Sequence, residues 1–177
     1  MDQRGLSVEL VRLALASQYR AGLAMLREAV ELCPDGAWES QDHANAFWQV
    51  AYHALYFTHL YLQPTPQDFV PWPGHQSAVQ NQDGIGGPPD PYSSWPVVPD
   101  PYTKQQVLEY CAYIDERIGG FLEALDLGSP DCGFPWYQVS KFEFQLVNVR
   151  HLHHHMAQLA DRVRTATGRG VSWVDAG

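Results

Sequence analysis

The sequence predicts an all-α fold, a four-helix bundle with one long proline-rich connection between the second and third helices. Two observations lead to this prediction. In four separate segments the apolar residues recur at every third or fourth position, which is the spacing of an amphipathic helix. Between the second and third segments, residues 63–102 contain ten of the 13 prolines of the chain. Prolines at this density exclude both a helix and a central strand.

The first two predicted helices extend from Ser7 to Cys33 and from Gln41 to Leu62. The first should end before Pro34, which cannot continue a helix. Ser40 precedes the second helix as a suitable N-cap, and Pro64 should end that helix. The apolar repeat of the first helix consists of Leu10, Leu13, Leu15, Leu23, Leu26, Val30 and Leu32.

The other two predicted helices extend from Thr103 to Gly128 and from Ser140 to Thr167. Each begins with a capping-box sequence, "TKQQ" or "SKFE", in which the first side chain bonds forward and the fourth reaches back. Gly119–Gly120 is a weak point in the third helix, because glycine lowers helix propensity. Gly168 should end the fourth helix.

The connection over residues 63–102 also carries Trp72, Tyr92 and Trp95. Long loops inside compact domains are usually either functional or disordered. Embedded aromatic side chains favour a loop that packs against the helices. We therefore expect an ordered crossover that walls a pocket and supplies aromatic side chains to a small substrate.

The composition is that of a globular protein, and we expect a single domain over residues 1–177. Of the 177 residues, 45% are hydrophobic and 18% are charged. The formal net charge of -9 argues against nucleic acid as a partner, because nucleic-acid binding requires clustered Lys and Arg. The longest apolar stretch, "AFWQVAYHALYFTHLYL", contains Gln and His. It therefore suits a buried helix better than a membrane span.

Cysteine usage and the N-terminal segment bear on the compartment. The three cysteines, Cys33, Cys111 and Cys132, are odd in number and show no CxxC spacing, so we expect no disulfide framework. The segment "MDQRGLSVEL" lacks the basic and apolar regions of a signal peptide. These features indicate a cytoplasmic protein.

The segment "NVRHLHHHMAQL", residues 148–159, places four histidines within five positions of the last predicted helix. His151 and His155 are four residues apart and share one helix face, as two imidazoles do when one helix presents them to a metal. Asn148 and Gln158 lie on the same inward face. Burying such polar groups without partners costs about 1–3 kcal/mol each, so something must satisfy them.

A metal site needs a third ligand, and the second predicted helix offers His53 and His59. His53 shares its face with apolar residues that should enter the interior. His59 lies on a different face of the same helix and is better explained as a hydrogen-bonded histidine at a second interface. His153 points away from His151 and should lie at the surface. His154 has an intermediate position, from which it could touch the rim of the site, pair with a carboxylate or lie at a subunit contact. From spacing alone, hydrogen-bonded core histidines remain an alternative to a metal site.

Three segments resemble the DinB/YfiT-like family. "NVRHLHHHMAQL" resembles the HxxHHxxQ signature on the last helix of that family. "YRAGLAMLREAVELCPDGAW" is similar to the first helix and turn of some members, and "FWQVAYHALYF" is similar to the second helix, which carries one inward histidine. The resemblance implies a four-helix bundle, often homodimeric, with a divalent metal held by His53, His151 and His155.

The function implied by the resemblance is metal-dependent chemistry on a small-molecule substrate. Some relatives transfer low-molecular-weight thiols onto electrophiles, isomerise maleylpyruvate with a thiol cofactor, or act as metal-dependent hydrolases. Three neutral imidazoles leave coordination positions open, which is typical of a catalytic site. Imidazole ligands suit several divalent metals, of which we expect Zn or Ni, with Fe as an alternative. Asn148 and Gln158 would support the ligands or orient substrate, or would simply satisfy buried polar atoms.

Three functional hypotheses follow. The first is a thiol-dependent S-transferase or a related hydrolase, with a low-molecular-weight thiol as a further cofactor in the transferase case. No basic cluster that would bind such a thiol is visible, which counts against the transferase. The second is a non-catalytic, dimerising stress-response bundle that binds a metal. The third is a bundle without a metal.

Overall fold

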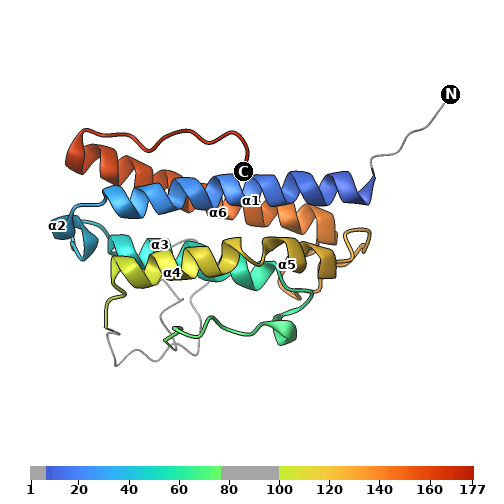
Figure 1. Cartoon of the computed structure of the whole chain (residues 1–177). Helices are drawn as coiled ribbons and strands as arrows, with labels where there is room; N and C mark the ends of the chain where they lie inside the picture. The colour runs from blue at the N-terminus through green and yellow to red at the C-terminus, as the bar shows by residue number, and fades with distance from the viewer. Residues whose placement is uncertain (1–6, 77–99) are drawn as a thin grey trace.

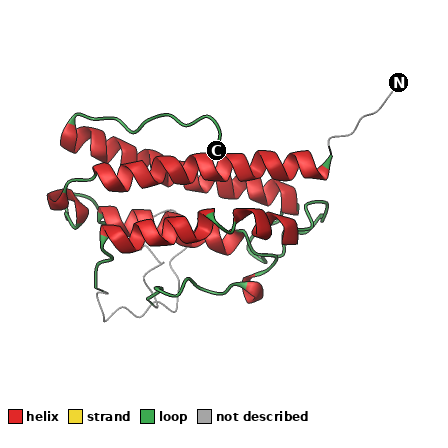
Figure 2. Cartoon of the chain, in the orientation of Figure 1, coloured by secondary structure: helices red, strands yellow, loops and turns green. Residues whose placement is uncertain are grey.

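The computed structural model describes residues 7–76 and 100–177, and within these ranges the regular structure is helical throughout (Figures 1 and 2). The prediction of an all-α fold is confirmed. The helices are α1 (Val8–Leu32), α2 (Asp35–Trp38), α3 (Phe47–Tyr61), the 3₁₀ helix η1 (Pro66–Asp68), α4 (Lys104–Asp115), α5 (Ile118–Ala124) and α6 (Lys141–Thr167).

The four longest helices surround one core. α1 packs against α6 and α4, and α3 packs against the same two helices from the other side (Figure 1). α5 follows α4 after a short break and also packs against α1. Gly22 lets α1 approach α6 closely, because a Cβ atom there would lie 2.8 Å from the Leu152 side chain. The largest fully buried side chains are aromatic, among them Tyr19, Tyr52, Tyr102, Tyr110, Phe47, Phe134 and Phe144.

The predicted start of the second helix at Gln41 is wrong, because α3 begins at Phe47. The Ser40 hydroxyl does not cap a helix. It donates to the carboxylate of Asp42 at 2.7 Å and accepts from the Asp42 backbone N–H at 3.1 Å, which forms a local turn. At the true start, the Gln49 side chain accepts a hydrogen bond from the backbone N–H of Ala46 at 2.7 Å. The short helix α2 was not expected from the sequence.

The third predicted helix is divided into α4 and α5, and it ends at Ala124 rather than at Gly128. The capping box is present, with hydrogen bonds in both directions between Thr103 and Gln106. The break lies at residues 116–117 and not at the two glycines, which lie inside α5. The Arg117 backbone N–H bonds to Ile114 three residues back, and its guanidinium lies 3.9 Å from the centre of the Tyr113 ring.

The last helix begins and ends where predicted, but of the expected capping box the structure has only the forward bond. The Ser140 hydroxyl accepts a hydrogen bond from the Glu143 backbone N–H at 3.2 Å. Gly168 ends α6 with φ of 72°, a left-handed conformation that glycine adopts without a steric cost. Lys141, in the first turn, is buried. Its ammonium group donates to the carbonyl oxygens of Pro64 and Cys132, which ties the end of α3 to the start of α6.

Both described ends of the proline-rich connection pack against the helices. Trp72 is 8% exposed and stacks on Tyr110, with ring centroids 4.9 Å apart. The Tyr102 hydroxyl accepts from the backbone N–H of Gln76 at 2.6 Å and donates to the carbonyl of Gly74 at 3.0 Å. The expected order therefore holds for residues 63–76 and 100–102. The expected roles of Tyr92 and Trp95 fall outside the described residues.

Two further expectations concern the described ranges. Cys33, Cys111 and Cys132 are buried free thiols, as expected from their number and spacing. No helix among residues 7–76 and 100–177 combines the length and the apolar character that crossing a bilayer requires.

His59 should make the stability of the fold depend on pH. Burial lowers its pKa from 6.5 to about 4. As the pH falls below 6.5, His59 is therefore protonated in the unfolded chain before it is protonated in the folded protein. The unfolding free energy that neutral His59 preserves at pH 7 is lost progressively towards pH 4. Between pH 7 and pH 4.5 this one group should remove about 2 kcal/mol of unfolding free energy.

Chemical denaturation of the wild type and of His59→Gln at both pH values measures this effect. The drop in unfolding free energy on acidification should be smaller in the variant, because glutamine does not titrate. Equal drops in the two proteins would contradict the assignment to His59.

Candidate metal centre

His53 of α3 and His151 and His155 of α6 form one cluster. The potential ligand atoms of these three side chains all lie within 4.8 Å of one another. The Nε2 atoms of His53 and His151 are 3.2 Å apart, and the ring centroids of His151 and His155 are 4.6 Å apart. Two nitrogens bound to one zinc at about 2 Å each lie roughly 3–4 Å apart, so this separation fits a shared ion.

The register of α6 against α3 creates the cluster. The amide nitrogen of Gln145 donates to the Tyr61 carbonyl at 3.1 Å, and that of Asn148 donates to the Thr58 carbonyl at 3.1 Å. The two helices are antiparallel, so three residues forward on α6 correspond to three residues back on α3. If this register is continued along both helices, His53 of α3 lies opposite the midpoint between His151 and His155 of α6. The spacing of four residues on α6 therefore places one imidazole on each side of His53.

Burial keeps the imidazoles of His151 and His155 neutral. His53 is 8% exposed, His155 is 2% exposed, and His151 is half-buried. Burial lowers the pKa of His151 to about 3, with further contributions from the neighbouring histidines His155 and His53. Burial also lowers the pKa of His155. Neutral imidazole is the form that binds a metal, so the apo protein already holds both residues in the ligand form at neutral pH.

Gln158 selects the tautomer of His155. Its Oε1 atom lies 2.9 Å from His155 Nδ1, so Nδ1 carries the proton and donates it, which leaves the lone pair on Nε2. The amide nitrogen of Gln158 lies 3.3 Å from His154 Nε2 and donates to it. Hydrogen bonds of this kind orient metal-bound histidines in known sites.

Asn148 is more deeply buried than Gln158. Its side chain contacts α3, whereas the side chain of Gln158 contacts His154 and His155. It is fully buried, and its hydrogen bond to the Thr58 carbonyl sets the helix register described above. Within the described part of the chain, His151 Nδ1 is a buried atom without a hydrogen-bond partner. The other ring nitrogen of His151, Nε2, lies 3.2 Å from His53 Nε2. This pair can share one proton, or both atoms can present their lone pairs to a cation, and three imidazoles are a donor set that fits a divalent cation.

Three further histidines of α3 and α6 are not among the three that form the cluster. His59 is 2% exposed and bonds to the Tyr110 hydroxyl at 3.1 Å, which agrees with its prediction as a hydrogen-bonded histidine at a second interface. The prediction that His153 lies at the surface is wrong. It is half-buried, its Nδ1 bonds to the Val149 carbonyl, and its ring packs beside Gly22 of α1. His154 is exposed and lies 3.3 Å from the Gln158 amide nitrogen, which agrees with a position at the rim, one of the three alternatives given for it.

The sequence placed Phe57 on the face of His53 but assigned no role in the site to the aromatic residues that adjoin the cluster. Phe57 and Tyr61 follow His53 at intervals of four residues and lie on the same face of α3. The ring centroid of Phe57 is 4.7 Å from that of His53. The spacing was visible in the sequence, but it is equally typical of a core face. The proline-rich connection contributes Phe69, which packs against Tyr56 at a centroid distance of 5.1 Å.

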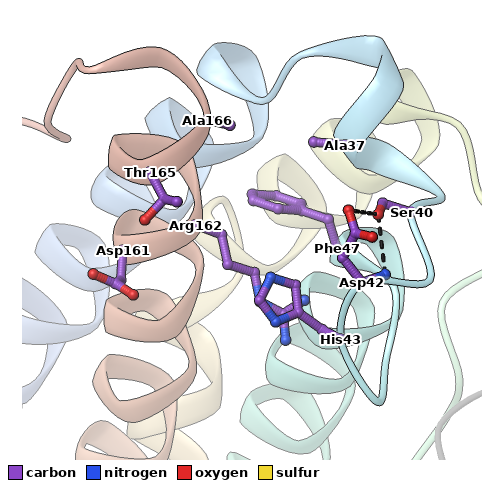
Figure 3. A pocket seen from close by; sticks show the side chains of 9 residues that line it. All are labelled: Ala37, Ser40, Asp42, His43, Phe47, Asp161, Arg162, Thr165 and Ala166. Atoms are coloured by element: carbon purple, nitrogen blue, oxygen red, sulfur yellow. Dashed lines mark hydrogen bonds between the residues drawn. The ribbon is translucent and has the colours of Figure 1, made fainter.

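A separate cavity of about 250 Å³ lies between α2, the start of α3 and the last turns of α6 (Figure 3). Phe47 contributes to its apolar lining, and Arg162 donates to the Asn45 carbonyl at 2.9 Å. Asp42 and Asp161 also contribute to the lining, and the Asp42 carboxylate accepts a hydrogen bond from the Ser40 hydroxyl (Figure 3). Arg162 is roughly two helical turns from His155, so this cavity is distinct from the histidine cluster.

Comparison with protein-family models, with curated protein sequences and with solved structures finds no match to this chain. The likeness to the DinB/YfiT-like family therefore rests on the residues quoted from the sequence. The geometry of the histidine cluster is independent of that likeness.

Removing the Gln158 amide should weaken metal binding without abolishing it. Gln158→Leu leaves the three histidines in place but no longer holds His155 in the tautomer with a free Nε2. Loss of such a supporting hydrogen bond typically costs about ten- to a hundredfold in metal affinity. Competition of zinc against a chelating dye measures the change. Gln105→Leu, at an exposed position on α4, is the matched control. Equal affinities in the two variants would refute this role for Gln158.

Proposed function

We propose that the chain is a metal-dependent enzyme of the DinB/YfiT-like four-helix-bundle class, acting on a small substrate. The ligands would be His53, His151 and His155. One observation carries the proposal: three imidazoles from two helices converge within 4.8 Å, and burial keeps His151 and His155 neutral. The HxxHHxxQ pattern and the inward histidine of α3 support the family assignment.

The ligand set favours a catalytic site over a closed structural one. A divalent cation held by three neutral imidazoles keeps open coordination positions, and lowers the pKa of a bound water or thiol towards neutrality. The chain's own residues do the positioning: Gln158 orients His155, and Asn148 fixes the spacing of the two helices. The half-buried edge of His151 leaves the cluster accessible from one side. Hydrolysis, or transfer of a thiol to an electrophile, is the class of reaction that this arrangement supports.

Metal content gives the direct test. Tag-free protein should bind about one Zn or Ni ion per chain, with Fe as an alternative, measured by elemental analysis after dialysis. His53→Ala and His151→Ala should each lose this metal, because two imidazoles remain in each. His43→Ala should retain it, since His43 is exposed and lies outside the cluster.

No metal in the wild type, and no uptake of Zn or Ni on titration, would refute the metal centre. Metal binding without turnover of any thiol or ester substrate would favour the non-catalytic, dimerising stress-response bundle instead.

A homodimer is part of the proposal, and one surface favours it. A groove of about 380 Å³ between α1 and α6 is almost wholly apolar. Leu10 and Leu146 line it and are 52% and 49% exposed. Water contact with such a surface is unfavourable by about 25 cal/mol per Å², which a second copy of the chain would relieve.

Leu146→Lys should convert the dimer to a monomer, because it places a charge in the apolar contact. Light scattering after size-exclusion chromatography measures the mass. Val70→Lys is the control, because Val70 is 71% exposed and lies in the connection, away from the groove. A monomeric wild type at tens of micromolar would contradict the dimer.

A further inference from the structure

A series of aromatic rings begins at the histidine cluster and follows α3 away from it. The ring centroid of Phe57 lies 4.7 Å from that of His53 and 5.8 Å from that of His151. Tyr61, one turn further on, lies 5.5 Å from Phe57 and 6.3 Å from His151. Both rings therefore adjoin the candidate ligands directly.

The series continues on two sides. Tyr137, from the segment before α6, lies 5.8 Å from Tyr61, and Tyr56 lies 5.4 Å from Phe57. Tyr56, Phe57 and Tyr137 are half-buried, so part of each ring is available to a ligand. We call Tyr56, Phe57, Tyr61 and Tyr137 the aromatic wall.

The aromatic wall is electrically neutral. Phenol groups are uncharged at neutral pH, and burial raises the pKa of Tyr56 further. The nearby cation, Lys141, is 4% exposed, and its ammonium group is engaged by the carbonyl oxygens of Pro64 and Cys132. Lys141 is therefore not available to pair with an anionic substrate.

We propose that the aromatic wall binds an aromatic ring of an uncharged substrate and directs the reacting group of that substrate to the histidine cluster. The proposal rests on the proposed function, since it assigns a substrate class to the same site. Partly exposed rings gain stacking contacts and lose water contact when a planar apolar ring covers them. An apolar wall beside a few convergent polar groups is the usual composition of a small-molecule site. The phenol group of half-buried Tyr137 can also form a hydrogen bond with a neutral polar substituent.

Hydroxamates test the substrate class, because they bind a divalent metal through one common group and vary only in the attached substituent. Calorimetric titration of the zinc-loaded protein should show that benzohydroxamate binds at least about tenfold more tightly than acetohydroxamate, since the phenyl ring buries more apolar surface. A carboxylate at the para position should weaken binding, because the ammonium group of Lys141 is already engaged by two carbonyl oxygens and cannot pair with it.

Phe57→Leu keeps an apolar side chain in place but removes the ring. It should reduce the preference for benzohydroxamate to about threefold or less, with unchanged zinc affinity. The matched control is Phe121→Leu on α5, a half-buried phenylalanine that packs on His59 and not on the cluster, and it should behave as the wild type.

The outcomes separate the two proposals. Zinc binding with equal affinities for the two hydroxamates, or with tighter binding of the para-carboxylate, overturns the aromatic substrate class and leaves the metal centre intact. An unchanged preference in Phe57→Leu overturns the role of the wall. Failure to bind zinc overturns the metal centre, and the substrate proposal with it.

Discussion

The structure depends on two buried hydrogen bonds that fix α6 against α3. Gln145 and Asn148 each donate a side-chain amide N–H to a main-chain carbonyl of α3. A buried amide without a partner costs about 1–3 kcal/mol, so sliding α6 by one residue would break both bonds and bury the amides unpaired. Apolar packing alone tolerates small shifts, because leucine and valine contacts are not directional. The hydrogen bonds of Gln145 and Asn148 remove that freedom, and the positions of the histidines follow from the resulting alignment of the two helices.

The sequence predicted the parts of the site that follow from local geometry. The spacing of His151 and His155 requires only a helix, and the capping residues and Gly168 defined that helix correctly. The choice of His53 over His59 followed from their different faces on one apolar helix, and the structure places only His53 beside the α6 pair. The family likeness added a ligand role, which the geometry accommodates.

The predictions from sequence were wrong where a tertiary contact or a competing local hydrogen bond determined a helix boundary or the burial of a side chain. Ser40 looked like an N-cap, but it bonds to Asp42 two residues later, and the helix starts at Phe47. At the break near Arg117, the guanidinium of that residue covers the Tyr113 ring, a contact that no propensity scale contains. His153 is half-buried only because α1 carries a glycine opposite it. Each of these contacts is specific to one pair of residues, so residue periodicity could not predict it.

Tyr102 has a consequence for how this protein can change. Its hydroxyl bonds to both Gly74 and Gln76, so the two described ends of the proline-rich connection meet at one side chain. The hydrogen bonds that align α3 with α6 come from Gln145 and Asn148 and do not involve this anchor. Substitutions at Tyr102 would therefore act on the two ends of the connection and not on the helix register. Selection can alter these ends while the three histidines stay in place.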